Sequence, residues 1–454
     1  MNQAARQGDL RNYTLVTAAY WADTLADGAS RMLVLFYFYQ LGYSAFEVAS
    51  LFLFYEFFGI VTNLVGGWVA ARLGLKATLF SGLGIQIFAL LMLGLAPESW
   101  LVVPYVMASQ ALSGIAKDLT KMSSKSAVKL VVPENSESSL FKWVAVLTGS
   151  KNALKGIGFF LGGLLLTLVG FQSGMLILVA IVGTALVTTA SMMHGGLGKA
   201  DGEAKFRHMF SNDRAINVLA AARVFLFASR DVWFVVGLPV YLSTVLGWSY
   251  WGVGAFLAVW VIGYGAVQAS APSFLSRRSR ETGHHPDGRT ATRLAFVLAF
   301  FPAAIAVALT ADFDPTTVLV TGLIAFGFVF AMNSAVHSYL VLSYARDDKV
   351  TMNVGFYYMA NAGGRLLGTV LSGALYQWYG LTGCLWASVA FVLGAAFLSL
   401  MLPSRPVAAP AGDGAGQPLK VDGPGSPKGS SRSLTALRKP SFAAFVWKSK
   451  PSLV

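Results

Sequence analysis

The chain has 454 residues, of which 55% are hydrophobic and 12% are charged, with a mean hydropathy of +0.61. An ordinary soluble domain carries roughly 25% charged residues, so this composition excludes a soluble globular protein. The net charge of +13 does not indicate nucleic-acid binding, because most basic residues lie in the C-terminal tail or between apolar runs. Basic residues in those places are typical topology signals of helical membrane proteins.

The apolar residues gather in runs long enough to cross a bilayer, which takes about 20 residues each. Twelve such runs lie at about 12–40, 46–71, 77–96, 101–121, 141–169, 172–193, 214–242, 250–275, 293–311, 316–344, 351–378 and 380–402. Every second connection carries Lys or Arg, whereas the others carry none. The positive-inside rule therefore predicts twelve transmembrane helices with the basic connections and both termini in the cytoplasm.

An internal repeat divides these runs into two sets of six. The segment LGYSAFEV (41–48) recurs as LGWSYWGV (246–253). Later in each set, Lys155, Gly158 and Gly163 have counterparts at Arg365, Gly368 and Gly373. Repeats of this kind are typical of transporters. We expect pseudo-symmetric six-helix bundles at 1–193 and 214–402, a cytoplasmic linker at 194–213 and a disordered cytoplasmic tail at 403–454.

Lys155 and Arg365 are the most informative ionisable pair. An ionised group at mid-membrane costs roughly 2.5 to 3.5 kcal/mol, so its presence requires a reason. A two-fold axis along the membrane normal would place the two cations on opposite sides of one gap, where they would repel unless an anion lay between them. Lys151, one helical turn before Lys155, adds a third charge. The alternative is that these cations pair with acids such as Glu56 or Asp27 for assembly alone.

Further cations lie on the expected fourth and seventh helices. Lys117 and Lys121 begin a row that continues at Lys125 and Lys129 with four-residue spacing, which keeps them on one helix face. They could guide an anion from the cytosol or belong to a basic helix end whose side chains reach the interface. Arg230 could assist an anion or pair with its neighbour Asp231.

The first expected helix carries Asp23, Asp27 and Arg31 along one stripe. Arg31 could contact substrate or form an ion pair with Asp27 on the same helix. Asp23, Asp27 and Glu56 are candidates for proton coupling, because a carboxyl group in a medium of low dielectric holds a proton more readily.

His337 and Asn361 could bind ligand oxygens or make interhelical hydrogen bonds. The single cysteine, Cys384, and the scattered histidines exclude the common metal-site spacings, and no cofactor is expected. No phosphate-binding loop and no Gly-x-Ser-x-Gly motif occur. An enzyme is therefore not expected, and a membrane receptor or scaffold that binds an anion without moving it is the alternative from another class.

The plan of twelve helices in two bundles resembles the major facilitator superfamily. The signature after its second helix reads Gly-x-x-x-Asp-Arg-x-Gly-Arg-Lys. The matching positions are Gly67, Arg72, Gly74 and Lys76, whereas Ala71 and Leu75 depart from the signature. The resemblance implies a secondary transporter.

A closer resemblance is to the organoarsenical efflux permeases of the ArsJ type. It is carried by the segments FLFYEFFGIVTNLVGGW (52–68), SGIAKDLTKMSSKSAVKLVVP (113–133), FKWVAVLTGSKNALKG (141–156) and NVGFYYMANAGGRLLG (353–368). The family implies a bacterial inner-membrane protein that exports 1-arseno-3-phosphoglycerate, an anion made by a partner glyceraldehyde-3-phosphate dehydrogenase, and so confers arsenate resistance. A monomer surrounded by lipid is expected, working by antiport or uniport. Export of another organic phosphate or of a drug is the alternative.

Overall fold

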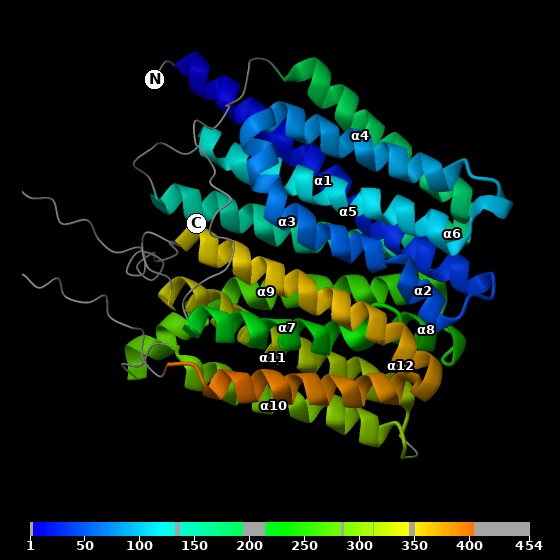
Figure 1. Cartoon of the computed structure of the whole chain (residues 1–454), viewed down its shortest axis with the longest axis vertical. Helices are drawn as coiled ribbons and strands as arrows, with labels where there is room; N and C mark the ends of the chain where they lie inside the picture. Colours follow the sequence, from blue (N-terminus) through cyan, green and yellow to red (C-terminus); the bar gives the residue numbers. More distant parts are fainter. Residues whose placement is uncertain are drawn as a thin grey trace, which may run out of the picture.

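The computed structural model describes residues 3–131, 137–193, 214–282, 286–311, 313–344 and 350–403, and these residues contain helices and no strand (Figure 1). The first half of the chain contributes α1 (Gln3–Gln40), α2 (Ala45–Leu51), α3 (Leu53–Leu73), α4 (Leu75–Gly94), the short 3-10 helix η1 (Glu98–Trp100), α5 (Val103–Val131) and α6 (Glu137–Met192). The second half contributes α7 (Arg214–Phe234), α8 (Gly237–Thr244), α9 (Tyr250–Thr282), α10 (Gly288–Ala308), α11 (Pro315–Tyr344) and α12 (Val350–Leu400). The predicted all-α class is confirmed. The predicted linker (194–213) and the tail beyond Pro403 lie outside the described residues.

Two glycines turn long helices back on themselves. Gly170 in α6 has φ 77° and Gly380 in α12 has φ 64°, and both interrupt the helical conformation. Glycine reaches positive φ without the steric cost that a Cβ would impose. Each of these helices therefore contains two of the predicted apolar runs. Gly42 and Gly247 also have positive φ, and the end of the molecule where these four glycines lie is called the turn end below.

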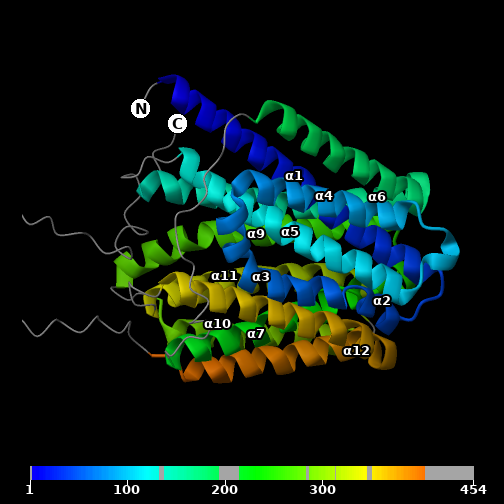
Figure 2. The ribbon, with the colours of Figure 1, turned by 45° about the horizontal axis from the view of Figure 1, so that its top comes forward.

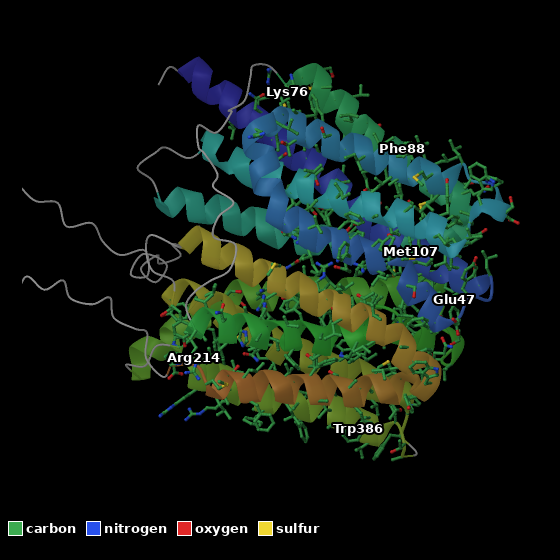
Figure 3. The ribbon with its side chains drawn as sticks, viewed as in Figure 1. Glu47, Lys76, Phe88, Met107, Arg214 and Trp386 are labelled. Carbon is green, nitrogen blue, oxygen red and sulfur yellow. The ribbon has the colours of Figure 1, made fainter. Side chains whose placement is uncertain are left out.

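The described helices have the lengths and surfaces of membrane-spanning segments. Seven segments are long and apolar enough to cross a bilayer, and two of them, Ser150–Met192 and Met359–Leu400, contain the turns at Gly170 and Gly380. Phe88 and Trp386, which are 59% and 48% exposed, point outward from opposite faces (Figure 3). The fold is that of a multi-pass membrane protein, and the count of twelve spans stays a prediction.

Helices α1–α6, called the N-terminal half, lie above helices α7–α12, called the C-terminal half, in Figure 1, whereas in the turned view of Figure 2 the halves overlap and α9 lies level with α5. Between them α6 packs against α9, and α12 packs against α2 and α3. The two seams repeat the same close contacts, because Gly163 meets the backbone of Tyr250 just as Gly373 meets that of Ala45. The sequence repeat is therefore also a repeat of contacts in space.

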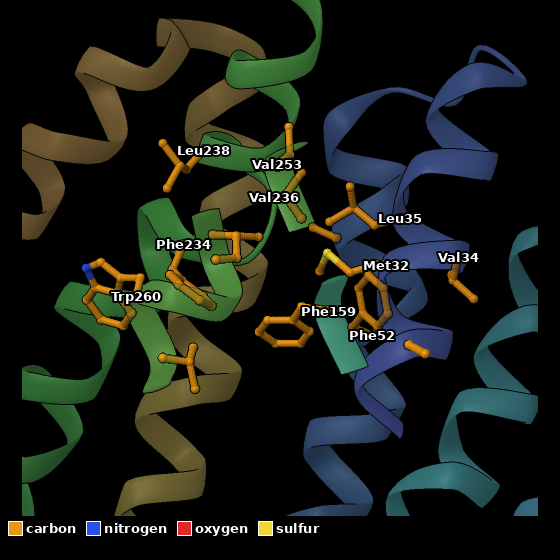
Figure 4. Close-up of a cluster of buried hydrophobic side chains, with 14 of the residues drawn as sticks. Met32, Val34, Leu35, Phe52, Phe159, Phe234, Val236, Leu238, Val253 and Trp260 are labelled. Carbon is orange, nitrogen blue, oxygen red and sulfur yellow. The ribbon is translucent and has the colours of Figure 1, made fainter. Parts of the chain in front are cut away.

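Apolar contacts join the halves toward the turn end. The rings of Phe36 and Tyr250 lie 4.7 Å apart. Phe159 lies between Met32 and Phe52 of the N-terminal half and Phe234 of the C-terminal half (Figure 4). Between helices in a bilayer, such contacts stabilise by close van der Waals packing. The described contacts thus close the turn end of the gap between the halves.

Close packing of α6 on α1 gives a direct prediction. A Cβ at Gly158 would lie 2.5 Å from the carbonyl oxygen of Leu25, whereas a Cβ at Gly183 of the same helix would meet nothing within 4 Å. Gly158→Ala should therefore destabilise the protein by about 1–3 kcal/mol, the usual cost of overpacking. Gly183→Ala is the matched control and should leave stability unchanged or raise it by up to about 1 kcal/mol. Thermal unfolding in detergent measures both, and equal midpoints would contradict the assigned packing.

Candidate functional site

A cavity of about 30 Å³ lies between the halves. Its wall combines four cations and one acid with apolar side chains. The lining residues are Arg31, Met32, Leu35, Phe52, Lys155, Phe159, Arg230, Asp231, Phe234, Val235 and Arg365. Lys155 and Arg365, which the sequence repeat relates, therefore reach one shared cavity. Since a cavity needs about 10–15 Å³ to hold a water molecule, this one has room for about two.

Three helices build the wall with the same local pattern. On α1, α6 and α7 a cation is followed one helical turn later, toward the turn end, by an apolar residue. The pairs are Arg31 with Leu35, Lys155 with Phe159, and Arg230 with Phe234. Residues four apart lie on one helix face, so each helix presents both to the cavity. The cavity thus has a cationic level and an apolar level, and the apolar level faces the closed turn end.

Glu56 of α3 forms ion pairs with one arginine from each half of the protein. Its side chain is 1% exposed. Arg31 Nη2 of α1 donates to Oε1 at 2.9 Å, and Arg365 Nη2 of α12 donates to both carboxylate oxygens at 2.6 Å. Charge-assisted hydrogen bonds of this kind are among the strongest in proteins. Arg31 therefore pairs across helices with Glu56, and the ion pair with Asp27 considered from the sequence does not form.

Lys155 differs from the other cations of the cavity. Its Nζ lies 5.6 Å from the centre of the Phe159 ring. Within the described part of the chain, no carboxylate lies within 4 Å of this ammonium group and no hydrogen bond engages it. A half-buried ammonium without an acid attracts anions strongly, because the low dielectric leaves its charge unscreened.

Arg230 is held by the residue that follows it. Its Nε and Nη2 both lie 2.5 Å from Asp231 Oδ1, and its guanidinium carbon lies 5.0 Å from the centre of the Phe227 ring. Asp231 also lies 4.0 Å from Arg365 Nε. The local pair considered from the sequence is therefore present, and Arg230 still reaches the cavity.

Tyr55 connects several charged groups beside the cavity. Its hydroxyl donates to the Asp27 carboxylate, with distances of 2.7 and 2.8 Å to the two oxygens. The centre of its ring lies 3.9 Å from Lys117 Nζ and 4.7 Å from the guanidinium carbon of Arg31. Cation–π contacts of this kind stabilise by about 0.5–2 kcal/mol. Lys117 and Asp27 thus lie next to Glu56 and its two arginine partners without lining the cavity.

A second polar network lies within the N-terminal half. Lys121 Nζ donates to Asp118 Oδ1 and to Asn63 Oδ1, each at 3.0 Å. Asp118 also accepts hydrogen bonds from Thr62 and Asn63. Asp23 on α1, which is fully buried, accepts a hydrogen bond from Thr120 Oγ1 at 2.6 Å. Lys121 is thus neutralised by an acid, which supports a structural role for this residue.

Three more predicted site residues lie away from the cavity. Lys151 is on α6, one turn before Lys155, but does not line it. His337 is fully buried on α11, and neither ring nitrogen has a hydrogen-bond partner within the described ranges. Asn361 on α12 is half-buried, and its Oδ1 is likewise unbonded. The structure therefore does not bring these three residues into the cavity.

Two residues that bond or contact predicted site residues were missed by sequence reasoning. Tyr55 precedes Glu56, and Asp118 follows Lys117 directly. The signal for Asp118 was available, because a buried acid beside a row of lysines predicts an ion pair. No comparable signal exists for Tyr55, since an aromatic residue in an apolar run is most often core.

Comparison with solved structures shows the fold. A bacterial homologue of the iron transporter ferroportin, in an inward-facing state, superposes with a TM-score of 0.64 at 15% identity, covering 86% of this chain and 98% of that one. A mutant of the nucleoside transporter NupG gives 0.63 at 15% identity, covering 87% and 98%. Identities this low establish shared architecture alone.

A curated relative is the Na(+), Li(+), K(+)/H(+) antiporter of Planococcus maritimus. It is 32% identical over 132 residues, which are 29% of this chain and 30% of that protein. The chain thus matches less than a third of that relative's length. The family model described as Major Facilitator Superfamily matches residues 16–334, more than half of the chain. Together with the transporter fold and the cavity between the halves, this match shows that the chain belongs to the major facilitator superfamily.

Proposed function

We propose that this protein is a secondary transporter that exports a small organic anion, and that its substrate is 1-arseno-3-phosphoglycerate. The observation that carries the proposal is the cavity in which Lys155, without an acid partner among the described residues, lies with three guanidinium groups. Arginine binds oxyanions through two donors at once, and lysine binds them as a point charge. The substrate assignment rests on the resemblance to organoarsenical permeases.

The same cavity argues against a free cation as cargo. Four cations and one acid line it, and an entering cation would meet net repulsion. Trivalent arsenic bound by thiols is also disfavoured, because the single cysteine, Cys384, is buried away from the cavity and soft thiolates are the ligands of choice for such a centre. An oxyanion needs no sulfur ligand.

The proposed direction of transport is supported by the positive-inside rule and by the membrane voltage. The end opposite the turn end carries Lys76 and Arg214, as Figure 3 shows, and the positive-inside rule assigns basic connections to the cytoplasm. The closed turn end then faces outward. Moving one negative charge out of a cell is favoured by about 2.3 kcal/mol per 100 mV, so export can proceed with little proton coupling. Residues 1–193 and 214–402 would move as two bodies.

The test is arsenate resistance in cells that lack their own arsenic exporters. Cells with the transporter and the dehydrogenase should accumulate several-fold less arsenic and grow at higher arsenate than cells with either protein alone. The Lys155→Ala/Arg365→Ala double variant, verified in the membrane, should give no protection. Protection without the dehydrogenase would refute the organoarsenical substrate, and full protection by the double variant would refute the site. Uptake of the organoarsenical into vesicles is then measured with competitors. If 3-phosphoglycerate inhibits this uptake only in part, or a lipophilic drug inhibits it fully, the result would indicate an exporter of another class.

A further inference from the structure

We infer that the site selects molecules that carry two separate anionic groups, because Glu56 fills one of two related anion positions and must be displaced before the halves can part. The inference rests on the proposed function and specifies the chemical class of its substrate. It makes Glu56 a specificity-determining residue that competes with the substrate.

The internal repeat defines the two positions. The close contact of Gly163 with Tyr250 in the α6–α9 seam matches that of Gly373 with Ala45 in the α2–α12 contact. By the same correspondence Lys155 matches Arg365, and Val261 of α9 matches Glu56. Val261 lies on the α9 face that meets α6, because a Cβ on Gly156 would lie 2.8 Å from the carbonyl oxygen of Ala258 and 3.1 Å from Ile262 Cγ1. By the repeat, therefore, the α9 counterpart of the Glu56 position holds a valine and no carboxylate.

Because of this difference, Arg365 is paired with an internal acid and Lys155, among the described residues, is not. Arg365 has two 2.6 Å contacts with the Glu56 carboxylate, whereas Lys155 has none with any described acid. The first anionic group of a substrate can bind at Lys155 at once. A second group that binds Arg31 and Arg365 must compete with Glu56, which already occupies donors of both guanidinium groups.

The size of the cavity also indicates that the site must change before a substrate can bind. Its volume of about 30 Å³ is far below the roughly 300–1,000 Å³ of sites for small organic ligands. The cavity in this conformation is therefore smaller than a three-carbon phosphate requires. Displacement of Glu56 breaks the ionic link between α3 and α12, so binding of the second group is coupled to separation of the halves.

The experiment compares two probes in vesicles containing the purified protein. 3-Phosphoglycerate carries a carboxylate and a phosphate, and glycerol 3-phosphate carries the phosphate alone on a chain of the same length. The wild-type protein should bind both and transport 3-phosphoglycerate at least about tenfold faster. In Glu56→Gln, which keeps the shape and removes the charge, the ratio of rates should fall toward one. Glu56→Asp, which keeps the charge, should retain the preference.

A second pair of variants tests the α9 counterpart of the Glu56 position without touching Glu56. Val261→Glu should supply Lys155 with an internal anion and weaken binding of both probes at least about tenfold, whereas Val261→Gln should bind them like the wild type. Equal transport of both probes by the wild type, an unchanged preference in Glu56→Gln, or equal binding by the two Val261 variants would overturn the inference. If the wild type binds neither probe, the proposed function itself fails. If Glu56→Gln does not fold, the Val261 pair decides.

Discussion

Replacing Lys155 with methionine should weaken binding of an anionic substrate by roughly 10- to 150-fold while leaving the stability of the protein unchanged or higher. Hydrogen bonds to a charged group contribute about 1.5–3 kcal/mol, and each 1.4 kcal/mol is a factor of ten in affinity. Lys155 has no acid partner within the described ranges, so its removal leaves no buried carboxylate without a counter-ion. Burying an ammonium group also costs free energy, which the methionine avoids.

The measurement combines substrate binding with thermal unfolding of the same preparation. Lys155→Arg is the matched control, because it keeps the positive charge and should bind within a few-fold of the wild type. A loss of stability in Lys155→Met would show that the ammonium has a structural partner. Unchanged affinity in Lys155→Met would remove Lys155 from the substrate site.

The second large effect is a loss of stability, which we expect when Asp118 is replaced. This carboxylate is 1% exposed and accepts hydrogen bonds from Lys121, Thr62 and Asn63. Asp118→Leu removes the acceptor and leaves the Lys121 ammonium without its acid. Removing one partner of a buried ion pair costs about 3–5 kcal/mol, so we expect a loss of stability of that order, measured by unfolding in detergent.

A double-mutant cycle separates this ion pair from simple packing. Lys121→Met should also destabilise, because it leaves a buried carboxylate with neutral donors only. The combined Asp118→Leu/Lys121→Met variant should be more stable than the sum of the two losses predicts, by about 0.5–3 kcal/mol. Strict additivity would mean that the 3.0 Å contact contributes nothing.

The repeat in the sequence predicted the most informative spatial relation in the molecule. Lys155 and Arg365 occupy related places on α6 and α12, and both reach the same cavity. This could be predicted because a duplicated helix keeps its tilt and the face it turns toward the axis, so equivalent residues lie opposite one another. Their role in binding substrate stays a prediction.

The choice of ionic partners could not be predicted in the same way. Arg31 lies four residues after Asp27 on α1, yet it bonds Glu56 while Asp27 takes the hydroxyl of Tyr55. The outcome depends on the distance between α1 and α3 and on a competing neutral donor, and neither is encoded in the spacing along one helix. The breaks between α2 and α3 and between α7 and α8 likewise lie inside runs that read as continuous.

The glycines of the α6–α9 seam have a mechanical consequence. Gly156 and Gly254 bring the two backbones so close that a Cβ at either would meet a carbonyl oxygen, at 2.8 Å from Ala258 and 2.6 Å from Phe159 respectively. Small residues let the two backbones approach closely and pack tightly along this seam, so we expect the seam to stay in contact while the halves move. The opposite seam is held by ionic bonds that must break first. We expect the halves to separate where α12 meets α2 and α3. The α6–α9 seam would then act as the hinge, and the ion pairs of Glu56 would be the link that breaks.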